Sequence, residues 1–372
     1  MAKSKIFRIA VIGILGIAVI FAVILFGAQE KEPITIGAII SVTGPQGPTA
    51  EGTGIRDGMI IAAEEINKFG GINGAKINLV IENAETNIEK GKEIFERMEK
   101  IYRPLLYVST HSSVSHAIAP LAEAASVVQM ATLASDPAIT RDKEWVFRYW
   151  PTAGVEAPSI IAVLGEENIK SLGILYLDDE FGRAVSSLIK EGFEKTGGQA
   201  SAKAFGIRDT DFTSTIRQFS EMDAIFSVGF PVHLKPIFKQ IREAGYKGAV
   251  FSNLAAADAS FHSLKEANGV FITAPIIYNP NSSFAEDLKG KYEERFEGTF
   301  THYVATGYDT LKLLAGLLED SDLTRENVKE LLKAGFVHPG TMGTVSTNPG
   351  EHEISFPVYP AQILNGELKY RY

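Results

Sequence analysis

The sequence predicts an α/β protein with two doubly wound parallel-sheet lobes, preceded by an N-terminal membrane anchor or signal helix. Apolar β-branched runs alternate with amphipathic helical patterns, which is typical of βαβ units. This alternation occurs twice, before and after Pro151, over about 120 residues each time. An uncharged run, residues 9–28, precedes both.

Composition excludes several classes of protein. The chain has 372 residues, enough for two domains of roughly 100–200 residues each. Its net charge of −9 disfavours nucleic-acid binding, because an acidic surface repels phosphate backbones. It has no cysteine, which rules out disulfides, thiolate metal sites, cysteine nucleophiles and a lipid-modified N-terminal cysteine.

The N-terminal 32 residues form a segment of their own. Lys3, Lys5 and Arg8 precede the uncharged run, whose 20 residues would span about 30 Å as a helix, the thickness of a bilayer core. Phe26 stands where a signal peptidase cutting after Ala28 needs a small residue. These features favour an uncleaved anchor with its N-terminus in the cytoplasm; a cleaved signal peptide or a buried core helix are the alternatives.

The first run, after this segment, begins with a strand and continues with helices and strands in turn. A glycine-rich turn at 69–74 should end its first helix, since glycine adopts the left-handed conformation that follows helices. Strands are expected at 33–42, 77–81, 105–108 and 127–130, with helical patterns over 55–66, 94–101 and 118–125.

The second run repeats the rhythm and ends differently. Asn365-Gly366 between two apolar runs predicts a type I′ hairpin at the C-terminus. Strands are expected at 172–177, 200–205, 224–228 and 249–251, helices over 185–193, 237–241, 284–296, 304–318 and 328–332, and the hairpin strands at 358–364 and 368–370.

No catalytic, cofactor or metal motif stands out. The glycines at 52, 54 and 58 have the wrong spacing for a dinucleotide fingerprint, so we expect them to serve packing. The acids at 178–180 follow a strand, where helix capping is the simplest role and cation binding the alternative. His111 and His116 have no carboxylate partner at a ligand spacing. We therefore predict no catalytic residues, no metal, no cofactor and no enzymatic activity.

Several segments together resemble the type I periplasmic solute-binding proteins, specifically the branched-chain amino acid receptors of ABC importers. The most specific are IGAIISVTGP at 36–45 and AAEEINKFGGING at 62–74. The similarity runs from about Pro33 to the C-terminus, and further matches follow in the expected order: Ser112-Ser113 with Pro120, ASDP at 134–137, VFRYWP at 146–151, YLDDEFG at 176–182 and DTDF at 209–212.

The resemblance implies two lobes joined by a hinge that close around a small solute. Chains of this family cross between the lobes three times. The expected division is therefore 33–151 with 276–338 for lobe 1 and 152–275 with 339–372 for lobe 2, after the N-terminal segment 1–32. The alternating rhythm alone would have given two contiguous lobes.

The resemblance also implies ligand contacts. In lobe 1, Ser112 and Ser113 occupy the loop that supplies donors to a ligand carboxylate, and Leu133 and Ser135 match a backbone and a hydroxyl position of the next loop. The alternative for the two adjacent serines is helix capping. In lobe 2, Phe181 and Phe230 replace aromatic residues that cover the ligand, with core packing as the alternative. Further candidates in loops expected to face the cleft are Glu51, Tyr149 and Glu156.

One departure from the family concerns the charge of the ligand. Leu254 stands where the receptors carry an acid that pairs with the α-ammonium group, and the nearest acid, Asp258, comes four residues later. A buried unpaired ammonium is costly. The sequence therefore favours a ligand with a carboxylate or amide and no ammonium. In the alternative, an amino acid binds and Asp258, Glu156 or Asp179 reaches its ammonium.

The predicted function is that of an extracytoplasmic solute-binding protein for an amino acid, amide or carboxylic acid. Its expected partners are the solute, the permease subunits of an ABC transporter and, through the N-terminal segment, the membrane. No nucleic-acid partner is expected. A sensor domain with the same clamp is the second hypothesis, and an enzyme without a recognisable catalytic set is the third.

Overall fold

A computed structural model describes residues 31–275, 285–354 and 358–371. The apolar run 9–28, and with it the predicted anchor, lies outside these residues. Among the described helices, none combines the length and the apolarity needed to cross a bilayer.

The first sheet is fully parallel and confirms the strands predicted for the first run. Its strand order is β4-β1-β5-β6-β7. The short edge strand β7 was not predicted. The elements are β1 (Lys31–Ile40), α2 (Ala50–Lys68), β4 (Ala75–Asn83), α3 (Ile88–Ile101), β5 (Leu106–Thr110), α4 (Ser112–Ala125), β6 (Val128–Thr132) and β7 (Val146–Arg148).

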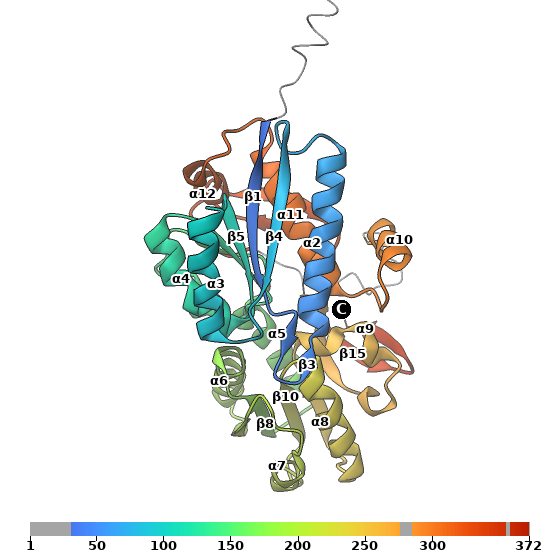
Figure 1. Cartoon of the computed structure of the whole chain (residues 1–372). Coiled ribbons are helices and arrows are strands. Elements are labelled where there is room, and N and C mark those ends of the chain that lie inside the picture. Colours follow the sequence, from blue (N-terminus) through green and yellow to red (C-terminus); the bar gives the residue numbers. More distant parts are fainter. Residues whose placement is uncertain (1–30, 276–284, 355–357, 372) are drawn as a thin grey trace, which may run out of the picture.

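Local signals fix the first helix, α2. The hydroxyl of Thr49 accepts a hydrogen bond from the Gly52 amide and caps its N-terminus. Gly70 and Gly71 follow the helix with positive φ angles of 102° and 78°, as the glycine-rich turn predicts. Figure 1 shows α2 on one side of the first sheet and α3 and α4 on the other.

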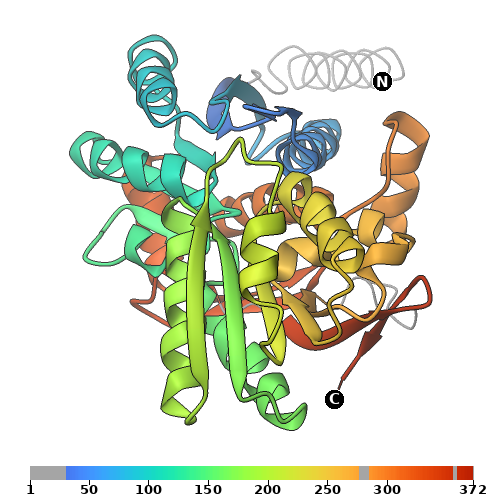
Figure 2. The ribbon, with the colours of Figure 1, turned by 90° about the horizontal axis from the view of Figure 1, so that it is seen from below.

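The second sheet repeats this winding. Its strand order is β16-β15-β12-β11-β10-β8-β9, with β9, β8, β10, β11 and β12 parallel. Figure 2 shows α6 and α8 on opposite sides of this sheet. The elements are α5 (Ala153–Glu166), β8 (Ser171–Leu177), α6 (Glu180–Lys195), β9 (Gln199–Phe205), α7 (Thr213–Gln218), β10 (Ala224–Val228), α8 (Pro231–Glu243), β11 (Ala249–Ser252), α9 (Ala259–His262) and β12 (Phe271–Pro275).

After β12 the chain returns to the first sheet. The helices α10 (Glu286–Arg295), α11 (His302–Leu318) and α12 (Arg325–Lys333) follow, and α11 packs along α2. A Cβ at Gly58 would collide with the backbone oxygen of Val304, and one at Gly307 with that of Ile55. Gly54 and Gly58 of α2 therefore serve close packing on α11, in line with the expected packing role.

The chain then crosses back to the second sheet. A small hairpin, β13 (Phe336–Gly340) with β14 (Gly343–Thr347), precedes β15 (Val358–Leu364) and β16 (Glu367–Tyr370). β15 pairs antiparallel with β12 and β16. Asn365 and Gly366 both have positive φ, 53° and 85°, which confirms the predicted C-terminal hairpin and its I′ turn residues.

Candidate functional site

The candidate site lies where the carboxyl ends of the two sheets face each other (Figure 1). Open α/β sheets bind ligands at this edge. A cavity of about 280 Å³ lies there, between loops of the first sheet and loops of the second. Its lining residues are Thr86, Ile88, His111, Ser113, Asp178, Asp179, Glu180, Arg183, Ile207 and Phe230.

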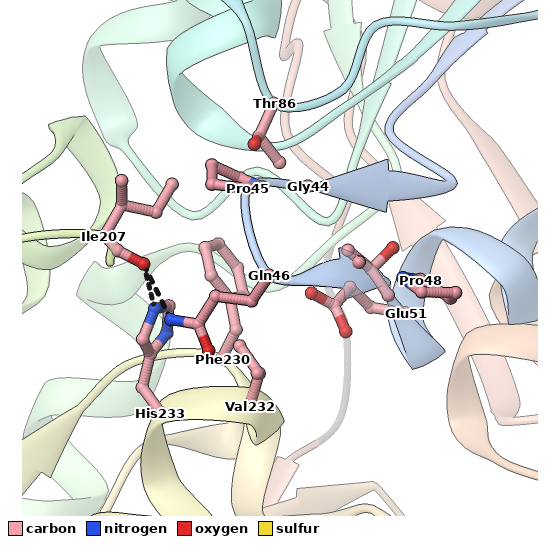
Figure 3. A pocket seen from close by; sticks show the side chains of 12 residues that line it. Gly44, Pro45, Gln46, Pro48, Glu51, Thr86, Ile207, Phe230, Val232 and His233 are labelled. Carbon is pink, nitrogen blue, oxygen red and sulfur yellow. Dashed lines mark hydrogen bonds between the residues drawn. The ribbon is translucent and has the colours of Figure 1, made fainter. Parts of the chain in front are cut away.

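A smaller pocket of about 30 Å³ adjoins this cavity and shares Thr86, Ile207 and Phe230 with it. It lies under the loop that carries the short strands β2 (Thr43–Gly44) and β3 (Gly47–Pro48). From this loop, Gln46 Nε2 donates a hydrogen bond of 2.9 Å to the Ile207 carbonyl oxygen, which follows β9 (Figure 3). The two halves of the molecule therefore touch across the site.

The N-terminus of α4 enters the cavity from the first sheet. His111 is its N-cap residue, with φ 66°, and no side chain caps the helix. Ser113 lines the cavity, whereas Ser112 is buried and its hydroxyl accepts a hydrogen bond from the Asp136 amide. Neither serine caps α4, so the capping alternative is wrong. The uncapped amides and the helix dipole favour an anionic group at this point.

Glu51 faces His111 in the same region. Glu51 lies in the first turn of α2, where the helix dipole stabilises its carboxylate, and is 3% exposed. Its Oε1 lies 3.7 Å from His111 Nε2, beyond a normal hydrogen bond. Nε2 has no hydrogen-bond partner among the described residues.

Aromatic rings cover the site from the second sheet. Phe230, the N-cap residue of α8, stacks on Phe181 at a centroid distance of 5.2 Å. His111 meets Phe230 edge-on at 4.9 Å, across the boundary between the two halves. Figure 3 shows Phe230 between Glu51 and His233. Both phenylalanines are buried, so the core-packing alternative for them stays open.

Asp179 borders the cavity and caps α6. Its Oδ1 accepts a hydrogen bond from the Gly182 amide, which confirms the capping role expected for the acids at 178–180. Burial raises the pKa of Asp179 to about 6, although that hydrogen bond and nearby His111 act in the opposite direction. Asp178 is exposed and pairs with Arg183.

The loop after β6 is held rigidly beside α4. Leu133 has φ 49°, an uncommon conformation for a branched side chain. Ser135 accepts a hydrogen bond from Trp150 Nε1, and buried Arg148 donates to the backbone oxygens of Ala134 and Asp136. The loop that the resemblance assigns to ligand binding is thus fixed by side chains that follow β6.

Tyr149 is fully buried and turned towards another residue. Its hydroxyl donates to Asp309 Oδ2 at 3.3 Å, and Asp309 also accepts from the Thr341 amide. Burial and the neighbouring Asp309 raise the pKa of Tyr149 well above its ordinary value. This contact links the segment after β7 to α11 and gives Tyr149 a structural role.

Glu156 holds the loop that contains Leu254, the residue that stands where the family's receptors carry an acid. Its Oε2 accepts from the Leu254 amide at 3.0 Å and from the Thr273 hydroxyl at 3.2 Å. Burial raises the pKa of Glu156 to about 7 despite these two hydrogen bonds. Leu254 itself is buried, 2% exposed.

The two carboxylate oxygens of Asp258 lie in different surroundings. Oδ1 caps α9 by accepting from the Ser260 amide at 2.8 Å. Oδ2 is buried and has no hydrogen-bond partner among the described residues.

The structure brings some of the ten predicted site residues to the two pockets. Glu51, Ser113 and Phe230 line the pockets, and Phe181 packs on Phe230. The residues that do not line them are Ser112, Leu133, Ser135, Tyr149, Glu156 and Asp258.

Two histidines of the site were not predicted. The sequence suggests His111 only as a metal ligand with His116, and no pattern singles out His233. Glu51 lies near both histidines, but it is 60 positions from His111 and 182 positions from His233 in the sequence. No spacing rule connects such residues, although the position of His111 directly before Ser112 was an available signal. Within the described residues, no cluster of three or more acidic or histidine side chains could hold a metal ion.

Comparison with known proteins places this geometry in a family. The sequence model described as "Periplasmic binding protein" matches residues 33–367. The leucine-, isoleucine-, valine-, threonine- and alanine-binding protein of Pseudomonas aeruginosa is 22% identical over 310 residues, which cover 79% of this chain and 82% of the relative.

Solved structures share the fold. A leucine-binding protein from Thermotoga maritima has a TM-score of 0.82 at 20% identity, covering 91% of this chain and 98% of its own. An ABC-transporter solute-binding protein from Rhodopseudomonas palustris, in complex with 3,4-dihydroxybenzoic acid, has a TM-score of 0.79 at 20% identity, covering 91% and 95%. The chain therefore belongs to the periplasmic binding protein family and has its type I fold, as the resemblance to the branched-chain amino acid receptors predicted.

Proposed function

We propose that this protein is a substrate-binding protein that captures a small organic solute between two lobes and delivers it to an ABC importer. Membership of its family implies an extracytoplasmic location. The observation that carries the proposal is the cavity of about 280 Å³ lined by residues of both sheets. Such a cavity opens when the two halves separate and excludes water when they meet.

The proposed lobes have the boundaries expected from the resemblance, 33–151 with 276–338 and 152–275 with 339–372. The packing of α11 on α2 supports the first, and the pairing of β15 with β12 supports the second. We further propose that the N-terminal segment 1–32 tethers the protein to the membrane. Its uncharged run and the absence of a small residue at position 26 support this.

The proposed contacts follow the electrostatics of the site. Ser113 and the uncapped amides of α4 are suited to a carboxylate or carbonyl oxygen. Phe181 and Phe230 provide an apolar wall. Ser112, Leu133 and Ser135 shape the adjoining loops, whereas the hydrogen bonds of Tyr149 and Glu156 favour structural roles.

The ligand's charge follows from the acids near the site. Leu254 supplies no acid, and Glu156 is already bonded to the amide of that residue. We therefore propose a solute with a carboxylate or amide and without an ammonium group. An amino acid paired with Asp258 or Asp179 is the competing solute, and the screen below separates the two.

A thermal-shift screen tests the proposal on the purified full-length protein. The panel contains amino acids, amides, aromatic and branched-chain acids, dicarboxylates and urea. A solute at about 100 times its Kd should stabilise the folded protein by about 2.7 kcal/mol. Stabilisation by leucine but not by its des-amino analogue would contradict the proposed charge, and stabilisation by no member of the panel would contradict the proposed function.

A further inference from the structure

The carboxylate of Glu51 lacks the partners that a buried charge normally has. Among the described residues, His111 is its only potentially cationic partner within 4 Å, at 3.7 Å. Glu51, His111 and His233 are each at least 97% buried, with exposed fractions of 3%, 1% and 2%. A buried polar group without a hydrogen bond is costly, so this arrangement points to a missing group.

His233 offers an acceptor to this region. Its Nε2 donates to the Ile207 carbonyl oxygen at 3.0 Å, because a carbonyl can only accept. Nδ1 is buried and has no partner among the described residues. Burial lowers the pKa of His233, which keeps the ring neutral and Nδ1 an acceptor, although nearby Glu51 and Asp209 oppose this shift.

His111 offers a donor. Thr110 Oγ1 accepts from the Ser41 amide at 3.1 Å and lies 3.2 Å from His111 Nδ1. The Thr110 hydroxyl hydrogen has no other acceptor among the described residues, so it points to Nδ1. In that tautomer Nε2 carries the hydrogen, and this N–H faces Glu51 across the 3.7 Å gap.

Glu51 and His111 thus present one acceptor and one donor, 3.7 Å apart, beside the pockets that meet at Phe230. A hydroxyl group has one hydrogen, so it can accept from His111 Nε2 and donate to Glu51, which matches this pair. An ammonium group only donates and would oppose the His111 N–H.

We propose that Glu51 and His111 form a subsite that binds a hydroxyl group of the solute, so that the solute is a hydroxylated organic acid. This inference rests on the proposed function, because it places the hydroxyl in the same interlobe site as the carboxylate. Glu51 and His111 both come from the first half, and His233 of the second half borders the small pocket that Glu51 lines.

Two pairs of acids test the proposal by calorimetry on the full-length protein: 4-hydroxybenzoate with benzoate, and 2-hydroxyisocaproate with isocaproate. In at least one pair, the hydroxylated acid should bind about 10-fold more tightly, equivalent to about 1.4 kcal/mol. Equal affinity within both pairs, or binding of none of the four acids, overturns the proposal. The proposed function survives either result if another solute of the screen binds.

A matched pair of variants locates the subsite. Glu51→Leu removes the acceptor, and Glu89→Leu removes the equivalent first-turn acid of α3, which lies outside both pockets. Glu51→Leu should reduce the preference for the hydroxylated acid to within about 2-fold, and Glu89→Leu should preserve it. Circular dichroism and a cooperative thermal transition show that Glu51→Leu is folded; a preserved preference in this variant overturns the proposal.

Discussion

At the residue scale, buried acids are the most informative feature of the molecule. Glu156 and Asp309 are buried and Asp179 is half-buried, and desolvation raises the pKa values of Glu156, Asp179 and Asp309 to about 7, 6 and 6. Each folded-state pKa lies above the ordinary value of the group. The folded protein therefore holds protons that the unfolded chain has released, and these acids make folding most favourable at acidic pH.

Glu156→Gln tests this linkage. Above pH 4.5 the unfolded carboxyl ionises while the folded one stays protonated up to about pH 7, so the unfolding free energy of the wild type falls across this window. Glutamine keeps an acceptor for the Leu254 amide and does not ionise. Between pH 5 and pH 8, the stability of the variant relative to the wild type should rise by about 2.5 kcal/mol in urea denaturation.

The control for that experiment is Glu191→Gln, at an exposed position of α6. It should leave the pH dependence of unfolding unchanged. A Glu156→Gln profile parallel to that of the wild type would mean that Glu156 titrates normally in the folded protein.

Ser113 gives a second prediction at this scale. Its hydroxyl lines the cavity at the uncapped N-terminus of α4. Ser113→Ala should weaken binding of the solute with the largest thermal shift by about 3- to 10-fold, because one hydrogen bond to a charged group is lost. Ser187→Ala, on the exposed side of α6, is the control for calorimetry. Equal loss of affinity in both variants would exclude a direct contact.

At the element scale, the capping of α2 positions Glu51. Thr49 Oγ1 accepts from the Gly52 amide and donates to the Ser41 carbonyl oxygen. Thr49→Ala should lower the unfolding free energy by about 1 kcal/mol. Thr324→Ala removes the equivalent cap of α12, far from the pockets, and serves as the control. Calorimetry should show weaker solute binding only for Thr49→Ala. Equal affinity in both variants would show that the cap of α2 does not contribute to solute binding.

The sequence predicted the regular elements well and the irregular ones poorly. Long apolar runs such as β1 and β8 and strong amphipathic patterns such as α3 and α6 were predicted within a few residues. The helix α5 was missed because Pro158 and two glycines interrupt its pattern. The strands β7 and β12, of three and five residues, are too short to show a period.

The site was predictable only where a motif carries it. Ser113, Phe181 and Phe230 follow strands directly, so their place at the carboxyl edge could be inferred. The relation of Glu51 to His111 and His233 depends on how α2, α4 and α8 converge, and no local pattern encodes it. Likewise, the engagement of Tyr149 by Asp309 joins residues 160 positions apart.

At the scale of the whole molecule, two similar windings face each other through their carboxyl edges. The strand orders β4-β1-β5-β6-β7 and β9-β8-β10-β11-β12 follow the same path, so both sheets direct equivalent loops at the site. Contacts across this boundary include a polar and an aromatic one, Gln46 with Ile207 and His111 with Phe230. A polar contact of this kind can be broken and replaced by water when the halves separate.

Gln46→Ala should therefore weaken the closed state without affecting either lobe. The 2.9 Å bond from Gln46 Nε2 to the Ile207 oxygen joins the two halves and is lost when they separate. We expect solute affinity to fall by about 3- to 10-fold, with an unchanged thermal midpoint in the absence of solute. In small-angle scattering, saturating solute should still reduce the radius of gyration of the variant, at a higher concentration than for the wild type.

The control for this prediction is Gln218→Ala, at an exposed end of α7. A radius of gyration that does not change at saturation, in either variant or in the wild type, would exclude hinge closure around the solute.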